Sequence, residues 1–159
     1  MKKEDDLRKV VLIGTGLVGM SMAYSMLNTG GIDELVLVDL DEEKALGEAM
    51  DMSHGLPYSK SSLKVKAGNY DECKDADIVV ITAGAAQKPG QTRLELVTIN
   101  AKIMKSITQS IMATGFDGII IVASKRKKFD FEKLVKHQAV VLKDFLDEKG
   151  EFEYLEPLE

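Results

Sequence analysis

The sequence predicts an α/β fold built on one doubly wound parallel sheet with helices on both faces. Short strand-like apolar runs alternate with longer helical segments, and this alternation favours parallel pairing through right-handed crossovers. Two of the runs, residues 78–81 and 119–122, are apolar at every position, which is typical of strands covered on both faces. No Pro-rich linker or low-complexity tract interrupts the 159 residues, so we predict a single domain over residues 1–159.

The first half of the pattern consists of a strand, a helix, a strand and a helix, at residues 10–13, 17–28, 35–38 and 42–53. The first helix shows the apolar spacing of three and four residues through Met20, Ala23 and Leu27. Gly30 and Gly31 follow and end it. The second helix has the same kind of apolar stripe and is therefore expected to pack against the sheet.

The second half consists of two strands, a long helix and a last strand, at residues 63–67, 78–81, 94–113 and 119–122. The strand at 63–67 alternates polar and apolar residues, so we expect one of its faces to meet solvent. The long helix keeps helical spacing from Leu94 through Val97 and Ala101 to Ile111.

Composition limits the class of protein. Hydrophobic residues make up 45% and charged residues 30%, a balance typical of globular chains and not of disordered ones. No apolar run is long enough to span a bilayer, and the charged start MKKEDDLRKV lacks the apolar stretch of a secretory signal. Cys73 is the single cysteine, which suits a reducing compartment, so we expect a cytoplasmic protein without a membrane partner. The net charge of −5 argues against a nucleic-acid partner.

Three glycines follow the first predicted strand in the pattern G-x-G-x-x-G and open the first predicted helix. In a Rossmann dinucleotide-binding unit, Gly14 permits the tight turn, Gly16 the approach of a pyrophosphate and Gly19 the packing of helix on strand. Asp39 ends the second predicted strand, where a carboxylate accepts hydrogen bonds from ribose hydroxyls and repels a 2′-phosphate. The pattern predicts NAD as cofactor, and the alternative is a mononucleotide fold in which Asp39 is incidental.

A loop is predicted at residues 82–93. It begins with the small residues Thr82-Ala83-Gly84-Ala85-Ala86, which allow a ligand to approach the carboxyl edge of the sheet. A Pro-Gly turn follows, and we expect the loop to close over a site. The guanidinium of Arg93 can polarise a carbonyl group at any working pH. The alternative is that Gln87 and Arg93 are ordinary solvated residues of a polar loop.

Four segments carry a resemblance to a known family: VLIGTGLVGMSMAYSM, LVLVDLDEEKALGEAMDMSHG, AGNYDECKDADIVVITAGAAQKPGQTRLELVTIN and NAKIMKSITQSIMATGFDGIIIVAS. They resemble the lactate and malate dehydrogenase family, and within it the NAD-binding half of bacterial L-lactate dehydrogenases, over about residues 8–124. The resemblance implies hydride transfer between NAD(H) and pyruvate or lactate. It puts Gln87 at the position that reads the substrate, and Arg93 at the position of the catalytic Arg that polarises the substrate carbonyl.

The resemblance also implies which residues bind the cofactor. They are Gly14, Gly16, Val18, Gly19, Asp39, Lys44, Tyr70, Gly84, Ala85, Ser106, Ala123 and Ser124. Tyr70 would line the adenine side, although simple packing explains a tyrosine there equally well. Lys44 has the alternative of being a solvated helix charge. No metal site is expected.

The resemblance stops after Ser124, where the family continues with Asn-Pro-Val-Asp and this chain reads Lys125-Arg126-Lys127-Lys128. The family's second half carries a His-Asp pair that exchanges the proton and an Arg for the substrate carboxylate, and the 159 residues do not include it. Neither His54 nor His137 is expected to replace that proton acceptor. We therefore expect NAD(H) binding without turnover by this chain alone, with pyruvate or lactate as substrate only where a substrate domain is supplied.

Residues 125–159 do not match the family but have the pattern of structured protein. Apolar residues form a helical stripe between Asp130, a plausible N-cap, and Gly150, a plausible stop. Residues 151–155 then alternate like an edge strand. We predict that this helix and strand complete the sheet, the alternative being a frame-shifted or artificial end.

The alternative function is a catalytically silent scaffold or a self-associating module, for which an engineered chimera is one origin. A homo-oligomer would use the helix at 42–53, which the resemblance assigns to a subunit interface.

Overall fold

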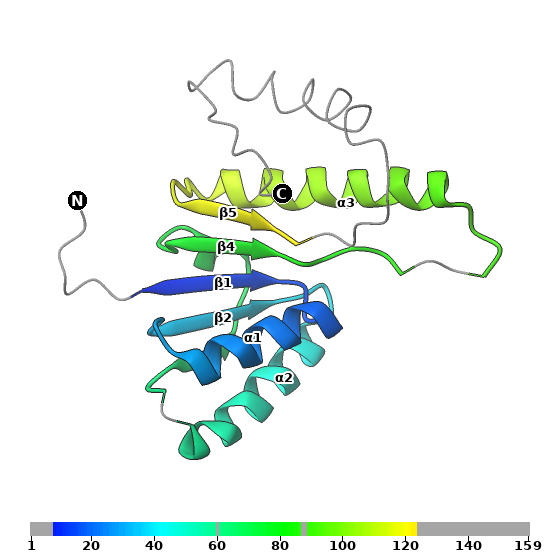
Figure 1. The fold of residues 1–159 in the computed structure, drawn as a ribbon. Coiled ribbons are helices and arrows are strands. Elements are labelled where there is room, and N and C mark those ends of the chain that lie inside the picture. Colours follow the sequence, from blue (N-terminus) through cyan, green and yellow to red (C-terminus); the bar gives the residue numbers. More distant parts are fainter. Residues whose placement is uncertain (1–7, 60, 87–88, 124–159) are drawn as a thin grey trace, which may run out of the picture. The chain divides into compact units, whose positions relative to one another are not determined.

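A computed structural model describes residues 8–59, 61–86 and 89–123, with the backbone alone for Arg93. The strands are β1 (Lys9–Ile13), β2 (Glu34–Val38), β3 (Lys64–Ala67), β4 (Ile78–Ile81) and β5 (Ile119–Val122). The helices are α1 (Leu17–Thr29), α2 (Glu42–Gly55) and α3 (Arg93–Ala113), with the short 3-10 helices η1 (Leu56–Tyr58) and η2 (Tyr70–Cys73). Every pair of neighbouring strands is parallel, in the order β3-β2-β1-β4-β5 (Figure 1). The predicted doubly wound α/β sheet is confirmed.

Strand β1 is the centre of the sheet and the point where the strand order reverses. Val11 of β1 lies opposite Val36 of β2 on one side and Val79 of β4 on the other. The chain builds outward from β1 through β2 to β3, and then returns to the other side of β1 for β4 and β5. Open α/β sheets bind ligands at such a switch point, outside the carboxyl ends of the strands.

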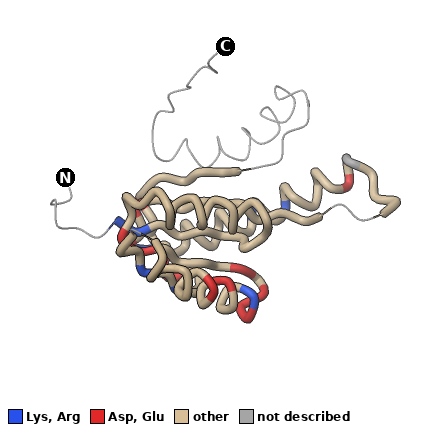
Figure 2. Tube along the Cα trace, turned by 60° about the horizontal axis from the view of Figure 1, so that its bottom comes forward, with Lys and Arg blue, Asp and Glu red and all other residues tan. Residues whose placement is uncertain are grey.

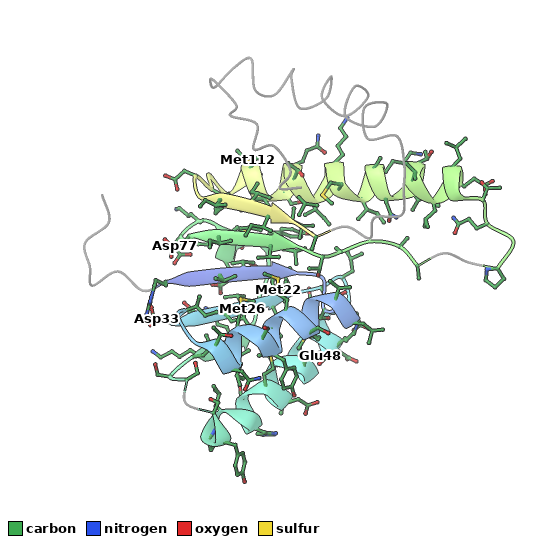
Figure 3. The ribbon with its side chains drawn as sticks, in the orientation of Figure 1. Met22, Met26, Asp33, Glu48, Asp77 and Met112 are labelled. Atoms are coloured by element: carbon green, nitrogen blue, oxygen red, sulfur yellow. The ribbon has the colours of Figure 1, made fainter. Side chains whose placement is uncertain are left out.

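Two apolar layers enclose the sheet. The layer under α1 and α2 contains the fully buried Leu12, Leu37 and Met52, and the partly buried Met22 and Met26 of α1 pack against it (Figure 3). The layer under α3 and η2 contains the strand residues that alternate with those of the first layer, because successive side chains of a strand point to opposite faces of the sheet. Figure 1 shows α1 and α2 together and α3 apart from them. Coverage on both faces explains why β4 is apolar at every position and why β1 and β2 are apolar after their first residue.

Strand β5 departs from the prediction that both of its faces are covered. Ile120 packs into the layer under α3, but Ile119 and Ile121 are 62% and 41% exposed. Their partners on β4, Ile78 and Val80, belong to the layer under α1 and α2. The helices on that face therefore reach β4 and stop short of β5, and within the described residues the prediction is wrong for this strand.

Charged side chains tie together the amino ends of the strands. Lys9 is only 5% exposed, and its Nζ lies 2.7 Å from Glu72 Oε2 and 2.7 Å from Asp75 Oδ1. The Nζ of Lys66 lies 2.9 Å from Glu34 Oε1 and 3.0 Å from Glu72 Oε1. Figure 2 shows basic and acidic residues together at this end of the sheet. The network joins β1, β2 and β3 to η2.

Two aspartates hold the same edge through backbone groups. Asp33 accepts hydrogen bonds from the backbone N–H and the Nε of Arg8, at 2.9 and 3.0 Å. Asp77 accepts one from the backbone N–H of Lys9 at 2.9 Å. Both lie at the amino end of the sheet in Figure 3. Within the described residues, the ion pairs lie at this edge, and the opposite, carboxyl edge carries the residues described next.

The chain divides into Met1–Ser124 and Lys125–Glu159, and every described residue belongs to the first unit. The predicted helix and strand of residues 125–159 lie outside the described residues, as do Gln87 and Ser124. Among the helices of the described part, none is long and apolar enough to cross a membrane.

Candidate functional site

The turn after β1 needs glycine at its first position and at its last. Gly14 has φ of +103°, and a Cβ on it would meet the backbone nitrogen of Ala83 at 2.6 Å. Both the backbone conformation and the lack of space therefore require glycine there. A Cβ on Gly19 would overlap the carbonyl oxygen of Gly14. Gly19 thus lets α1 begin directly against the turn.

The first turn of α1 is open to solvent. Gly16, its N-cap, receives no side-chain capping bond, and a Cβ on it would meet nothing within 4 Å. Leu17 and Val18 are 92% and 59% exposed. The first N–H groups of a helix have no partner within the helix, and they favour an anion together with the helix dipole. The turn therefore fits a phosphate group, as the glycine pattern predicts.

Asp39 reaches the same turn from the end of β2. Its Oδ2 accepts two hydrogen bonds from Thr15, one from the backbone N–H at 2.7 Å and one from Oγ1 at 2.8 Å. Its Oδ1 accepts a longer bond from the backbone N–H of Asp41 at 3.2 Å. Asp39 is partly exposed, so its carboxylate is both anchored to the turn and within reach of a ligand.

Hydrogen bonds favour the ionised form of Asp39 in spite of its partial burial. Burial raises the pKa of Asp39, but the bonds from Thr15 and from the N–H of Asp41, together with the positive charge of Lys44, outweigh burial, so the pKa lies below its ordinary value. The pKa of Tyr70 is raised by burial, by Cys73 and by the charge of Asp39. The predicted residues Lys44 and Tyr70 therefore share the electrostatic surroundings of Asp39.

The end of β4 holds the turn from the other side. Thr82 donates a hydrogen bond from Oγ1 to the carbonyl oxygen of Gly14 at 2.7 Å. Ala85, further along, donates its backbone N–H to Oδ1 of Asn100 in α3 at 2.8 Å. A Cβ on Gly84 would lie 3.4 Å from that same oxygen. The small residues after β4 are thus hydrogen-bonded both to the glycine turn and to α3.

The remaining predicted residues are less closely tied to the turn. Ser106 is exposed on α3. Ala123 follows β5 and donates its backbone N–H to the carbonyl oxygen of Ile81 at 2.9 Å. Arg93 is the first residue of α3, directly after the N-cap Thr92. Their contacts with a ligand stay predictions, as do those of the undescribed Gln87 and Ser124.

The sequence did not predict a side-chain role for three residues of the site: Thr15, Thr82 and Asn100. Each acts through a polar side chain on a neighbouring backbone or carboxylate group. The position of Thr82, directly after a buried strand that pairs with β1, is a signal that identifies it once strand order is known.

His54, the histidine among the described residues, does not lie at the carboxyl edge of the sheet. His54 is exposed in the last turn of α2, a helix that starts beside the carboxyl end of β2 and runs back toward the amino edge. The described part of the carboxyl edge can thus bind phosphate and hydroxyl groups, and it holds no histidine as proton acceptor.

Residues 8–126 match the model of the lactate/malate dehydrogenase NAD-binding domain. Among curated relatives, an L-lactate dehydrogenase of Lactococcus lactis subsp. cremoris is 58% identical over 117 residues, which are 74% of this chain and 37% of that protein.

Solved structures agree with the family match. The minor L-lactate dehydrogenase of Enterococcus mundtii in its ligands-bound form has a TM-score of 0.73 at 53% identity, over 75% of this chain and 38% of that one. The malate dehydrogenase of Archaeoglobus fulgidus in complex with NADH has a TM-score of 0.67 at 39% identity, over 72% of this chain and 39% of that one. The chain thus spans less than two fifths of the length of the proteins it matches.

Proposed function

Because the chain belongs to the lactate/malate dehydrogenase family through its NAD-binding domain, residues 8–126, we propose that the glycine turn and Asp39 hold NAD(H) at the carboxyl edge of the sheet. The observation that carries the proposal is that the open first turn of α1 lies beside an ionised carboxylate on the next strand. A pyrophosphate needs N–H donors, and ribose hydroxyls need an acceptor. In this chain, the N–H donors of α1 and the carboxylate acceptor of Asp39 lie next to each other.

The geometry supports the proposed phosphate and ribose roles. Gly14, Gly16 and Val18 receive the pyrophosphate at the first turn of α1, while Gly19 lets that helix approach. Asp39 accepts hydrogen bonds from the adenosine ribose hydroxyls. Its negative charge disfavours a 2′-phosphate, so NAD is preferred over NADP.

The other predicted contacts complete the cofactor site in this proposal. Lys44 and Tyr70 contact the adenosine end, which their electrostatic interaction with Asp39 supports. Five small residues are proposed to contact the rest of the cofactor: Gly84, Ala85, Ser106, Ala123 and Ser124. The hydrogen bond from the N–H of Ala85 to Asn100 supports a fixed backbone after β4.

The reaction proposed for the whole protein is hydride transfer between NAD(H) and pyruvate or lactate, as the names of the L-lactate dehydrogenases that it resembles suggest. When bound, NAD(H) supplies or accepts the hydride. Gln87 reads the substrate, and the guanidinium of Arg93 polarises its carbonyl group. Location in the cytoplasm stays a prediction.

We propose further that the 159 residues alone bind the cofactor without turning over pyruvate. Hydride transfer to a carbonyl needs a proton donor within hydrogen-bond reach. His54 is exposed at the far end of α2, which supports its having no such role. Gln87 and Arg93 would then contact a substrate only where a separately supplied substrate domain provides the proton donor.

Calorimetric titration with NADH and with NADPH tests the binding site. We expect NADH to bind more tightly, and we expect Asp39→Ala to weaken NADH binding by about 1–3 kcal/mol, the range for hydrogen bonds to a charged group. Asp51→Ala, which removes an exposed carboxylate near the far end of α2, is the matched control. Absence of NADH binding by the unmodified chain would overturn the proposed binding site. Pyruvate reduction by the chain alone would overturn the proposal that the chain does not turn over substrate.

Self-association is a second candidate function, favoured by one observation on α2. Leu46 and Met50, one turn apart on this helix, are each 53% exposed. An apolar strip of this kind suits a homo-oligomer contact. Sedimentation equilibrium tests it: Met50→Glu should shift an oligomer toward monomer, and a monomeric unmodified chain would exclude this candidate.

A further inference from the structure

Thr15 lies inside the glycine turn and is 1% exposed, although its side chain is polar. Both of its donors go to one atom, because the N–H and Oγ1 lie 2.7 and 2.8 Å from Oδ2 of Asp39. The glycine pattern sets no requirement on the side chain between its first two glycines. The Thr15 hydroxyl therefore has a role that the pattern does not explain.

The two bonds make the oxygens of Asp39 unequal. Oδ2 accepts both short bonds from Thr15, whereas Oδ1 accepts the 3.2 Å bond from the N–H of Asp41. A carboxylate oxygen can accept from two directions. Oδ1 therefore keeps acceptor capacity for a ligand hydroxyl, and the partial exposure of Asp39 lets a ligand reach it.

We propose that Thr15 is a positioning residue that fixes the orientation of the Asp39 carboxylate and thereby sets the preference for NADH over NADPH. The inference rests on the proposed function, since it concerns the same site. Two hydrogen bonds to Oδ2 oppose rotation about the Cβ–Cγ bond of Asp39. The carboxylate then presents Oδ1 to the ribose hydroxyls and cannot turn away from a 2′-phosphate. A carboxylate free to rotate discriminates less, because it can swing aside.

Thr15 also lowers the pKa of Asp39. Burial of Asp39 disfavours the ionised carboxylate, and the donors of Thr15 favour it. Loss of the Oγ1 donor therefore raises the pKa of Asp39. The pKa thus measures the bond, while the orientation of the carboxylate sets the cofactor preference.

Three substitutions separate the hydroxyl of Thr15 from its packing. Valine keeps the β-branched shape without the donor, and serine keeps the donor without the methyl group. Alanine is a second hydroxyl-free variant, for use if valine impairs folding. Thr82→Val is the matched control, because it removes a partly buried hydroxyl that bonds the same turn at the Gly14 carbonyl and does not contact Asp39.

Titration of the full chain with NADH and NADPH gives the first readout. Thr15→Val should raise the Kd for NADH about tenfold, as expected for loss of a charge-assisted hydrogen bond, and change the Kd for NADPH about threefold or less. The preference for NADH then falls. Thr15→Ser should stay within about threefold of the unmodified chain for both cofactors. Thr82→Val should weaken both cofactors by one common factor.

Carbon-13 NMR of the Asp39 carboxyl group, titrated without cofactor, gives the second readout. Thr15→Val should raise the pKa of Asp39, while Thr15→Ser and Thr82→Val should leave it in place. An unchanged Asp39 pKa, or equal weakening of NADH and NADPH in Thr15→Val, would overturn the inference. An unmodified chain that bound no NADH would overturn the proposed function and with it the cofactor preference, and the NMR titration alone would then decide the positioning role.

Discussion

Glycine has two different physical roles in this chain, and Gly14 and Gly47 separate them. Gly14 has a positive φ and touches the backbone after β4, so it provides a conformation and a space that no other residue fits. Gly47 lies within α2, where a Cβ would meet nothing within 4 Å. There, glycine only adds conformational freedom to the unfolded chain.

We therefore expect opposite effects of alanine at the two positions. Gly14→Ala should lower the free energy of unfolding by about 1–3 kcal/mol, the usual cost of a non-glycine residue in a strained conformation, and should weaken NADH binding. Gly47→Ala should raise the free energy of unfolding by about 0.5–1 kcal/mol and leave NADH binding unchanged. Urea unfolding of both variants measures the difference. A Gly14→Ala chain as stable as the unmodified one would show that the turn can relax.

The sequence predicts part of the candidate site, and there is a physical reason why it does not predict the rest. Gly14 and Asp39 belong to a pattern of fixed spacing in which each residue type suits one part of the cofactor. The pattern can therefore be found in a single sequence. Thr15 and Thr82 act on groups brought close only by the pairing of β1 with β2 and β4. Threonine is frequent, and the carboxylate that Thr15 bonds is distant in sequence. The roles of Thr15 and Thr82 can therefore be recognised only once the strand order is known.

The elements themselves were largely predictable because each is buried in a regular way. The strands 78–81 and 119–122 match their predicted bounds, and α2 extends only two residues past its predicted end. Coverage was harder to predict. An apolar run shows that a strand avoids water, but it does not show which helix covers it, and β5 has α3 on one face and exposed Ile119 and Ile121 on the other.

The start of α3 was predicted within one residue and is fixed by a capping box. Oγ1 of Thr92 accepts a bond from the N–H of Glu95 at 3.3 Å, and Glu95 Oε2 accepts one from the N–H of Thr92 at 2.9 Å. The bond from the backbone N–H of Thr92, followed by the Thr92 side chain, lowers the pKa of Glu95. Since Arg93 is the first residue of the helix, the cap also sets its backbone.

Thr92→Ala should therefore fray the start of α3 and cost about 1 kcal/mol of stability, as lost N-caps typically do. Thr98→Ala is the control, because its hydroxyl bonds the Leu94 carbonyl within the helix and caps nothing. Amide hydrogen exchange measures the local effect, which should appear in the first turn of α3 and leave the sheet protected. Equal exchange in both variants would contradict the capping role.

Across the whole molecule, stabilising charges and the candidate site occupy opposite edges of the sheet. The amino edge is joined by Lys9, Lys66 and their carboxylate partners, and the carboxyl edge by the glycine turn, Asp39 and Thr82. Substitution of the amino-edge network should therefore change stability without changing cofactor preference. The division makes stability and binding separately measurable.

The amino-edge network predicts how stability depends on pH. The pKa values of Glu72 and Asp75 are lowered, first of all by their hydrogen bonds to Lys9. Burial lowers the pKa of Lys9, but its bonds to Asp75 and Glu72 outweigh burial and raise it. A lowered carboxylate pKa contributes stability above the unfolded-state value, near pH 4, and loses it as pH falls through the folded-state value. The lysine's contribution is present at neutral pH and is lost only as pH rises beyond its ordinary value of 10.5.

Lys9→Met should accordingly lower the free energy of unfolding by about 1–3 kcal/mol at pH 7, mainly because the partly buried Glu72 loses a buried partner, while the exposed Asp75 contributes little. At pH 3 those carboxylates are largely protonated in the unfolded chain, so the difference between Lys9→Met and the unmodified chain should shrink. Lys74→Met, which removes an exposed lysine beside Asp75, should change little at either pH. Urea unfolding at the two pH values decides between charge and packing. A constant difference would mean that the methylene stem of Lys9, and not its ion pairs, stabilises the amino edge.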